Sequence, residues 1–280
     1  MSSFLKHHYG LPILSLAVGI AACTLLMHAQ HTPHRGDSPV LRMHCAAGIK
    51  NALEPSLEAF TSRTGIHVEV TYGGSGVLLS DFRTRPDGVD LFLAADDEYT
   101  RSAKEYGLID TIVPLAQMRP VIAYEHGNPH HIHGLDDLAH PTLRVALAHP
   151  ETAAIGKCTK QILTQHGYWN TLRTQAVVCK PTVNELANDL KLNAVDAAIT
   201  WDATARQYPE IDCICPPEFH DAISTVSIGI SARTRMLEAA QTLTHDLRDT
   251  KRGGFHFEAW GYELIPHKHH TTDRVNEISP

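Results

Sequence analysis

A glycine-rich turn between a strand pattern and a helix pattern is the feature that most constrains this chain. Residues 66–70 alternate apolar and polar side chains, residues 73–76 read Gly-Gly-Ser-Gly, and an apolar run continues through Phe82. This order predicts a strand, a turn and the start of a helix. Because the free backbone N–H groups and the dipole at a helix start favour negative charge, Ser75 and Gly76 are candidate anion-binding residues.

Three well-known glycine motifs do not match this turn. A nucleophile elbow needs G-x-S-x-G, but Val77 stands where the last glycine belongs. The dinucleotide fingerprint G-x-G-x-x-G fails at Leu79, and the sequence has no G-x-x-x-x-G-K-[ST] phosphate loop. The stretch alone is compatible with an anion site or with a plain turn. No set of nucleophile, base and orienting residue can be assembled elsewhere in the sequence, so an enzyme is not expected.

Residues 1–29 have the form of an export signal. Lys6 lies in a weakly cationic start, and a mostly apolar stretch follows at residues 11–27. The stretch is near the lower limit of the roughly 17–25 residues that a spanning helix needs, so an uncleaved anchor is an alternative. In both cases the rest of the chain is expected outside the cytoplasm, in the periplasm or its equivalent.

A second outcome for the export signal is lipidation. Residues 20–23 resemble a lipoprotein cleavage box, which would place a lipidated Cys23 at the new N-terminus. Residues 30–39, rich in His, Pro, Gly and Asp, predict a tether. Contact with the membrane is therefore expected only through this N-terminal signal or its lipid.

The composition after the tether is that of a globular protein. About 240 residues remain, enough for two domains of ordinary size. The whole chain has 24 Lys and Arg against 31 Asp and Glu, which gives a formal net charge of -7. It therefore has no general basic field for nucleic acid, and local dipoles would have to hold an anionic ligand.

Strand and helix patterns alternate along the chain. The first half predicts strands at 40–48, 66–70 and 89–95, with helices after each. The second half predicts further strands and helices, with Thr182 as an N-cap and Glu185 completing a capping box. Predicted strands lie at 121–124, 144–148, 177–180, 197–201 and 226–230, and helices at 135–138, 157–163 and 236–247. Such alternation predicts an α/β fold with helices on the faces of a sheet.

Four strand-to-helix junctions carry small residues or caps. They lie at Gly48, at Ser75, at Ile155 with Gly156, and at Val183. In open α/β sheets, ligands bind beyond the carboxyl ends of the strands, where helix starts gather. If two junctions belong to each of two domains, their N–H groups can enclose a small anion across a cleft.

These junctions carry a family resemblance. The chain resembles the molybdate-binding proteins of bacterial ABC importers over nearly all of its length after the tether. The motifs that carry the resemblance are Cys45-Ala46-Ala47-Gly48, Tyr72-Gly73-Gly74-Ser75-Gly76-Val77-Leu78, the stretch from Asp90 to Asp96, His149-Pro150-Glu151, Ala154-Ile155-Gly156-Lys157, Ala198-Ile199-Thr200-Trp201 and Trp260-Gly261-Tyr262.

The resemblance implies a type II periplasmic binding protein fold, with two α/β lobes and a ligand cleft between them. Residues 40–118 and 224–266 would form one lobe, residues 119–223 the other, and residues 267–280 a His-rich tail. The chain would cross between the lobes near residues 117–120 and 222–225. The expected ligand is molybdate or tungstate, with no further cofactor, and the expected partner is the importer's membrane permease. A monomer is expected.

The resemblance also assigns residues to the site. Ser75 keeps one of the family's two serines, and Ile155 and Val183 fall where backbone donors are expected. Gly48 replaces the other serine and Trp201 replaces a tyrosine, so two hydroxyl donors are lost.

Other donors can replace those hydroxyls. The N–H of Gly48, the indole N–H of Trp201 and the ammonium of Lys157 are all suitable. Asp202 would repel an oxyanion if it faced the pocket, or supply a carboxylate for a cation. The alternatives are that it caps the next helix or pairs with Lys157 or Arg206.

A transition-metal protein is the rival hypothesis. The chain has 20 histidines, gathered notably at residues 126–133 and 267–270, and neutral imidazole suits zinc, copper or nickel. Met43-His44-Cys45 at a strand end is another candidate, for which core packing is the simpler interpretation. No metal site is assigned to particular residues.

The cysteines leave disulfide pairing open. The chain has six, and five remain if Cys23 is lipidated. Cys158 and Cys179 fall in the same expected lobe and can pair. Cys213 and Cys215, one residue apart, can pair under strain or bond to other thiols.

Overall fold

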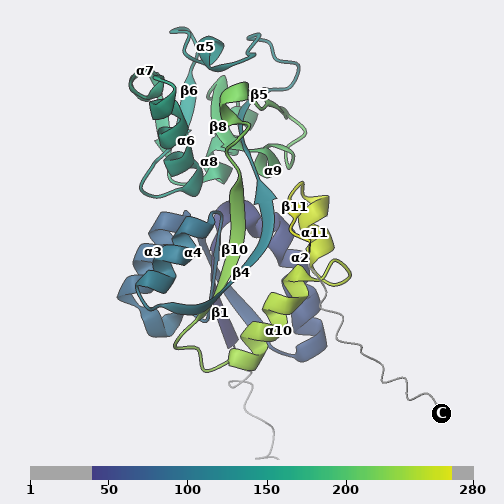
Figure 1. Ribbon diagram of the computed structural model, residues 1–280. Helices are drawn as coiled ribbons and strands as arrows, with labels where there is room; N and C mark the ends of the chain where they lie inside the picture. The colour runs from purple at the N-terminus through teal and green to yellow at the C-terminus, as the bar shows by residue number, and fades with distance from the viewer. Residues whose placement is uncertain (1–39, 267–280) are drawn as a thin grey trace, which may run out of the picture. The chain divides into compact units, whose positions relative to one another are not determined.

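The computed structural model describes residues 40–266, which form two mixed sheets covered by helices. The expected export signal, tether and His-rich tail lie outside these residues. We call residues 40–118 and 224–266 lobe 1 and residues 119–223 lobe 2 (Figure 1). The predicted α/β class with two lobes is confirmed by this arrangement.

Lobe 1 is built on a six-stranded sheet of order β11-β4-β10-β3-β1-β2. Strands β2, β1 and β3 are parallel. Strand β10 pairs antiparallel with β3, β4 pairs antiparallel with β10, and β11 pairs antiparallel with β4. The strands are β1 Val40–Ala46, β2 His67–Gly73, β3 Leu91–Ala94, β4 Ile109–Met118, β10 Ser224–Ser231 and β11 Glu263–Leu264. The helices are α2 Lys50–Thr64, α3 Ser75–Thr84, α4 Asp97–Glu105, α10 Leu237–Arg248 and α11 Gly254–Ala259, with 3-10 turns at η1 Ala47–Ile49 and η2 Pro86–Gly88.

Lobe 2 is built on a five-stranded sheet of order β7-β6-β8-β5-β9. Its strands are β5 Pro120–Glu125, β6 Val145–Ala148, β7 Val178–Lys180, β8 Ala197–Trp201 and β9 Ile211–Ile214. Its helices are α5 Leu135–Leu138, α6 Ala154–Gln165, α7 Trp169–Gln175, α8 Val183–Lys191 and α9 Asp202–Ala205, with a 3-10 turn at η3 Pro217–Phe219.

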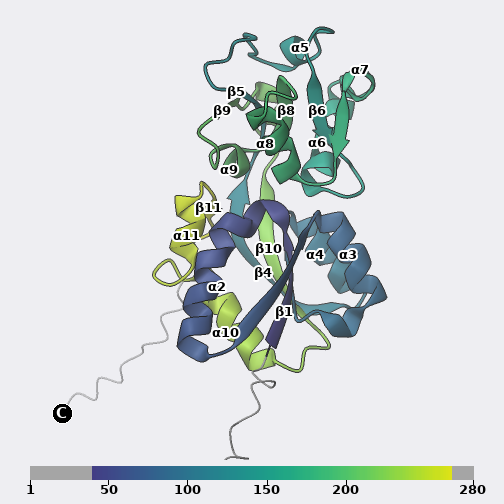
Figure 2. The same ribbon diagram turned by 180° about the vertical axis from the view of Figure 1, so that it is seen from behind.

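The chain passes between the lobes twice, at neighbouring points. Strand β4 of lobe 1 ends at Met118, and β5 of lobe 2 begins two residues later at Pro120. The return path enters β10, whose first residue Ser224 pairs with Met118. Figures 1 and 2 show β4 and β10 side by side where they lead from one sheet toward the other. Two short adjacent connections of this kind suit a hinge between lobes.

Local sequence explains how the helices begin and end. The side chain of Asp96 accepts a hydrogen bond from Glu98 N and caps α4, and Thr182 with Glu185 forms the predicted capping box of α8. Helix α2 ends at Gly65, whose φ of 72° is the left-handed conformation that glycine adopts without strain. All four residues of β3 are buried, as its continuous apolar run predicts.

Some elements have no counterpart in the sequence-based prediction. The longest is β4, whose ten residues carry the chain toward the other lobe. Helix α7 and strand β9 are also absent from that prediction. Within residues 40–266, no helix is both long enough and apolar enough to cross a membrane.

Candidate functional site

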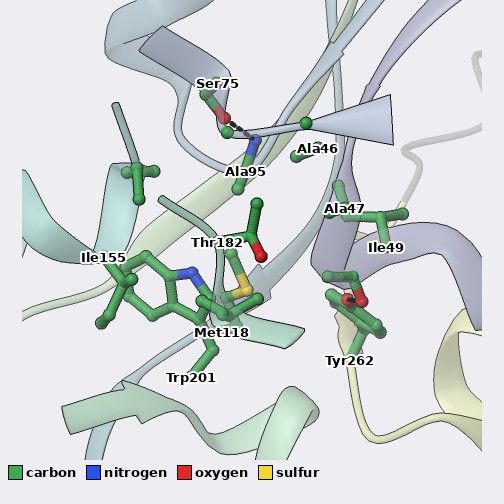
Figure 3. Close-up of a pocket in the computed structure, with 16 residues that line it drawn as sticks. Ala46, Ala47, Ile49, Ser75, Ala95, Met118, Ile155, Thr182, Trp201 and Tyr262 are labelled. Atoms are coloured by element: carbon green, nitrogen blue, oxygen red, sulfur yellow. Dashed lines mark hydrogen bonds between the residues drawn. The ribbon is translucent and has the colours of Figure 1, made fainter. Parts of the chain in front are cut away.

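A small cavity lies where the two lobes meet, and Figure 3 shows its lining. Its volume is about 20 Å³, counted as the space open to the centre of a water-sized sphere. A single water molecule needs roughly 10–15 Å³ on this measure, so the cavity suits a very small ligand. Lobe 1 contributes Ala46, Ala47, Gly48, Ile49, Gly73, Gly74, Ser75, Ala95, Met118 and Tyr262, and lobe 2 contributes Ala153, Ala154, Ile155, Thr182, Val183 and Trp201.

Four helical segments begin at this cavity. In lobe 1, β1 leads into η1 and then α2, and β2 leads through Gly74 into α3. In lobe 2, α6 begins at Ala154 after β6, and α8 begins at Val183 after β7. The predicted junctions at Gly48, Ser75, Ile155 and Val183 all contribute lining residues. Their dipoles direct partial positive charge at one small volume from both lobes.

Ser75 is the first residue of α3 and is only 2% exposed. Its Oγ accepts a hydrogen bond from the backbone N–H of Ala95 at 3.2 Å (Figure 3). A hydroxyl has one proton and two acceptor positions, so the Ser75 proton stays available to donate into the cavity. Ser75 is therefore an oriented hydroxyl donor at this wall.

The first turns of the lobe 2 helices carry backbone donors without partners. The N–H groups of Ala154, Ile155, Val183 and Asn184 have no hydrogen-bond partner within the described part of the chain. Ile155 is fully buried against the cavity. Helix starts normally leave such groups free for water, side chains or ligands. Here they can bond a ligand in the cavity.

Trp201 supplies another donor from lobe 2. It is the last residue of β8, is 2% exposed, and its indole N–H has no hydrogen-bond partner among residues 40–266. Figure 3 shows its ring opposite Tyr262, with the nitrogen edge toward the cavity. Because an indole nitrogen only donates, this wall favours a ligand that accepts hydrogen bonds.

The lining residues include no charged side chain, and the two possible accessory residues lie outside the cavity. Lys157 forms an ion pair with Glu98 of lobe 1 instead of facing a ligand. Asp202 begins α9, where its Oδ1 accepts from Arg119 N at 3.0 Å and from Ala203 N at 2.8 Å. Its Oδ2 lies 3.9 Å from Arg206 Nη2, so the predicted pairing with Arg206 is formed, whereas Lys157 pairs with Glu98. Asp202 is the first residue of α9, and its side chain does not cap the helix.

Gly76 and Gly156 also lie outside the lining, and both allow close backbone approach. The N–H of Gly76 donates to the carbonyl of Thr152 in lobe 2 at 3.1 Å. A Cβ atom on Gly76 would stand 2.2 Å from the carbonyl oxygen of Glu151. A Cβ atom on Gly156 would stand 2.5 Å from the carbonyl oxygen of His149. Glycine at position 76 lets the two lobes touch, and glycine at position 156 lets the helix pack closely. The predicted role of both residues in ligand binding is therefore not needed to explain why glycine is present.

Tyr262 is a lining residue that the sequence-based site does not include. Its hydroxyl donates to the carbonyl oxygen of Gly48 at 2.8 Å, and the side chain is buried. Burial raises the pKa of this phenol above its ordinary value, so it stays protonated at neutral pH. The motif Trp260-Gly261-Tyr262 is the available signal, but its sequence position alone does not place it at the cavity.

Polar contacts across the lobes hold this arrangement closed. Asn184 Nδ2 donates to Ala47 O at 3.2 Å, and Gln207 Nε2 donates to Gly48 O at 3.3 Å. Asn51 Nδ2 of α2 donates to Gln207 Oε1 at 2.8 Å. The cavity therefore lies between two lobes that are in contact.

The candidate metal sites that fall within residues 40–266 do not assemble. Within residues 40–266, no group of three or more His, Cys, Asp or Glu side chains is placed to hold a metal ion. His44 Nδ1 lies 3.3 Å from Leu78 O and its Nε2 lies 3.4 Å from Asp81 Oδ2, while Cys45 is buried. Successive residues of a strand point to opposite faces, which separates His44 from Met43 and Cys45. Of the two His segments, residues 267–270 lie outside the described range.

The five cysteines in the described range are free thiols. Neither possible pairing, Cys158 with Cys179 or Cys213 with Cys215, is formed.

Comparison with known proteins identifies the family of this chain. The model of the family described as bacterial extracellular solute-binding protein matches residues 41–263. A binding protein of Haemophilus influenzae is 28% identical over 203 residues, which cover 72% of this chain and 82% of that protein.

Solved structures share the fold and confirm the predicted type II periplasmic binding protein fold. The periplasmic molybdate-binding protein of Azotobacter vinelandii is similar with a TM-score of 0.69 at 19% identity, covering 81% of this chain and all of that one. A periplasmic thiamin binding protein is similar with a TM-score of 0.72 at 15% identity, covering 84% of this chain and 86% of that one. At such identities the likeness concerns the fold, and the ligands of these two proteins differ in size and charge.

Proposed function

Because the chain belongs to the family of bacterial extracellular solute-binding proteins, we propose that it captures a tetrahedral oxyanion, molybdate or tungstate. We further propose that it delivers this ion to the membrane permease of an ABC importer. Members of this family are binding proteins that work outside the cytoplasm, so capture without chemical conversion is the activity to expect.

One observation carries the oxyanion proposal. The Ser75 hydroxyl, the Trp201 indole N–H and the free N–H groups at the starts of α6 and α8 surround one small cavity without a charged side chain. Neutral donors from both lobes suit a ligand that brings its own negative charge and only accepts hydrogen bonds. A hydrogen bond to a charged group contributes about 1.5–3 kcal/mol, so several such donors can hold a desolvated dianion.

The size of the cavity narrows the ligand class further. Its volume of about 20 Å³ leaves no space for a ring system or a sugar in the closed arrangement. A compact ion with one central atom is the kind of ligand that such a cavity admits after small adjustments of the lobes. This argues against a thiamin-like ligand, although the fold is shared with a thiamin binding protein.

The donors also discriminate between oxyanions by protonation. Molybdate and tungstate present four oxygens as acceptors, whereas a protonated phosphate brings a hydrogen that needs an acceptor in the site. The Trp201 indole N–H and the backbone N–H groups at the starts of α6 and α8 can only donate, so they offer no acceptor to such a hydrogen. We therefore expect protonated phosphate to bind more weakly than an unprotonated dianion.

A ligand panel tests this function. Purified protein is titrated calorimetrically with molybdate, tungstate, sulfate, phosphate and thiamin, with Trp fluorescence as a second readout. We expect saturable one-to-one binding of molybdate and tungstate that is stronger than binding of phosphate, and no binding of thiamin. Binding of thiamin, or a response to zinc or copper without a response to any oxyanion, would contradict the proposal.

A further inference from the structure

The carbonyl oxygen of Gly48 accepts two hydrogen bonds, one from each lobe. The Tyr262 hydroxyl of lobe 1 lies 2.8 Å away, and Gln207 Nε2 of lobe 2 lies 3.3 Å away. A carbonyl oxygen has two acceptor positions, so both bonds can exist together. Figure 3 shows Tyr262 beside Ile49, on the side of the cavity away from Trp201 and Ile155.

Gln207 is held in a defined orientation by two further partners. Its Oε1 accepts from Asn51 Nδ2 of α2 at 2.8 Å, and its Nε2 also donates to Ala203 O at 3.1 Å. The amide can reach both Asn51 and Gly48 only when lobe 2 lies against lobe 1. The Gln207 bond to Gly48 is therefore a product of closure, whereas Tyr262 and Gly48 belong to the same lobe.

In the closed arrangement, the Tyr262 hydroxyl can therefore donate either to Gly48 O or to a ligand. Without Gln207, turning the hydroxyl toward a ligand would leave Gly48 O with neither of the two donors that it has among the described residues. A buried acceptor without a partner is unfavourable. With Gln207 in place, Gly48 O keeps a donor after the hydroxyl turns. Burial raises the pKa of the phenol, so it has a proton to donate at neutral pH.

We infer that Tyr262 is a further hydroxyl ligand of the captured oxyanion, and that Gln207 releases it for this role when the lobes close. This inference rests on the proposed function. Gly48 has no side chain, so Tyr262 supplies the hydroxyl at that wall of the cavity. Gln207 is a positioning residue, because it acts on the ligand only through Gly48 and Tyr262.

A double-mutant cycle with molybdate as the probe tests the inference. The variants are Tyr262→Phe, Gln207→Leu and the double variant, and their dissociation constants are measured by calorimetry. Phe keeps the ring packing against Phe257, whose centroid lies 5.6 Å from that of Tyr262. The control is Tyr106→Phe, because Tyr106 is exposed and lies outside the cavity lining.

We expect Tyr262→Phe to weaken molybdate binding roughly tenfold or more in the wild-type background, and less than about threefold in the Gln207→Leu background. Tyr106→Phe should leave the affinity unchanged. A purely structural role for Tyr262 would give the same factor in both backgrounds, and that result would overturn the inference.

The two proposals fail in different ways. If Ser75→Ala weakens molybdate binding but Tyr262→Phe does not, Tyr262 is no ligand and the proposed function stands. If the wild-type protein binds neither molybdate nor tungstate, the proposed function fails, and the inference fails with it.

Discussion

Gly48 of lobe 1 lies so close to Val183 of lobe 2 that a Cβ atom on Gly48 would stand 2.7 Å from Val183 Cγ2. The same Cβ atom would stand 3.3 Å from Thr204 Oγ1. Both neighbours belong to the opposite lobe, so the absence of a side chain at Gly48 is a condition for closure. A serine side chain at this position, which the resemblance to molybdate-binding proteins leads one to expect, would therefore meet the opposite lobe.

Gly48→Ala should therefore weaken oxyanion binding by obstructing closure. Overpacking of this kind costs about 1–3 kcal/mol, which corresponds to roughly a five- to 150-fold increase in the dissociation constant. Calorimetric titration with molybdate measures the change. Adding Val183→Ala should restore part of the affinity, and Gly88→Ala is the control because nothing lies within 4 Å of its Cβ position. If Gly48→Ala binds molybdate as tightly as the wild type, the contact between position 48 and Val183 does not limit closure of the lobes.

Ser75→Ala should weaken molybdate binding with little loss of stability. Removing one donor to a charged ligand costs about 1.5–3 kcal/mol, or roughly a 10- to 150-fold loss of affinity. The lost bond from Ala95 N should lower the melting temperature by only a few degrees in a protein of this size. Ser80→Ala on the exposed face of the same helix is the matched control. A Ser75→Ala protein that binds like wild type would remove Ser75 from the site.

The general position of the site could be predicted from the sequence because its signals are local. A strand, a small residue or cap, and a helix start are visible in neighbouring residues, and the junctions at Gly48, Ser75, Ile155 and Val183 indeed meet at one cavity. Trp201, at the end of a predicted strand, lies there too. Their common position could be predicted because ligands of open α/β sheets bind at the carboxyl ends of the strands.

Tyr262 and the two glycines show what local patterns cannot predict. Tyr262 reaches the cavity because the C-terminal segment returns to pair β11 with β4, a long-range contact without a nearby sequence signal. Because Gly76 and Gly156 lie at helix starts, the sequence predicts that they bind the ligand. A Cβ atom on either glycine would stand only 2.2 Å or 2.5 Å from a backbone carbonyl oxygen, which indicates close packing against segments that no local pattern identifies.

Lys157→Gln should have only a small effect on binding. The ion pair of Lys157 with Glu98 joins the lobes, but the two side chains are 47% and 48% exposed, so solvent screens it. Exposed ion pairs contribute less than about 1 kcal/mol, and we expect less than roughly a fivefold change in molybdate affinity. Lys104→Gln, an exposed residue of α4, is the control. A loss of more than about 100-fold would identify Lys157 as a direct ligand.

Molybdate affinity should be nearly independent of pH between about 6 and 9. No lining residue is a histidine, carboxylate or lysine, and burial raises the pKa of Tyr262 above its ordinary value of about 10. The phenol therefore stays a protonated donor throughout this range. Titrations at several pH values test this directly. An affinity that rises as pH falls through about 6.5 would indicate that a histidine cation binds the anion.

Anomalous X-ray scattering at the molybdenum edge, from crystals grown with molybdate, would locate the bound ion. We expect one strong anomalous peak between the lobes, with oxygens within hydrogen-bond distance of Ser75 Oγ, the Ile155 N–H and the Trp201 indole nitrogen. A peak only at the surface histidines, or an empty cavity in crystals of a protein that binds molybdate in solution, would rule out oxyanion capture between the lobes.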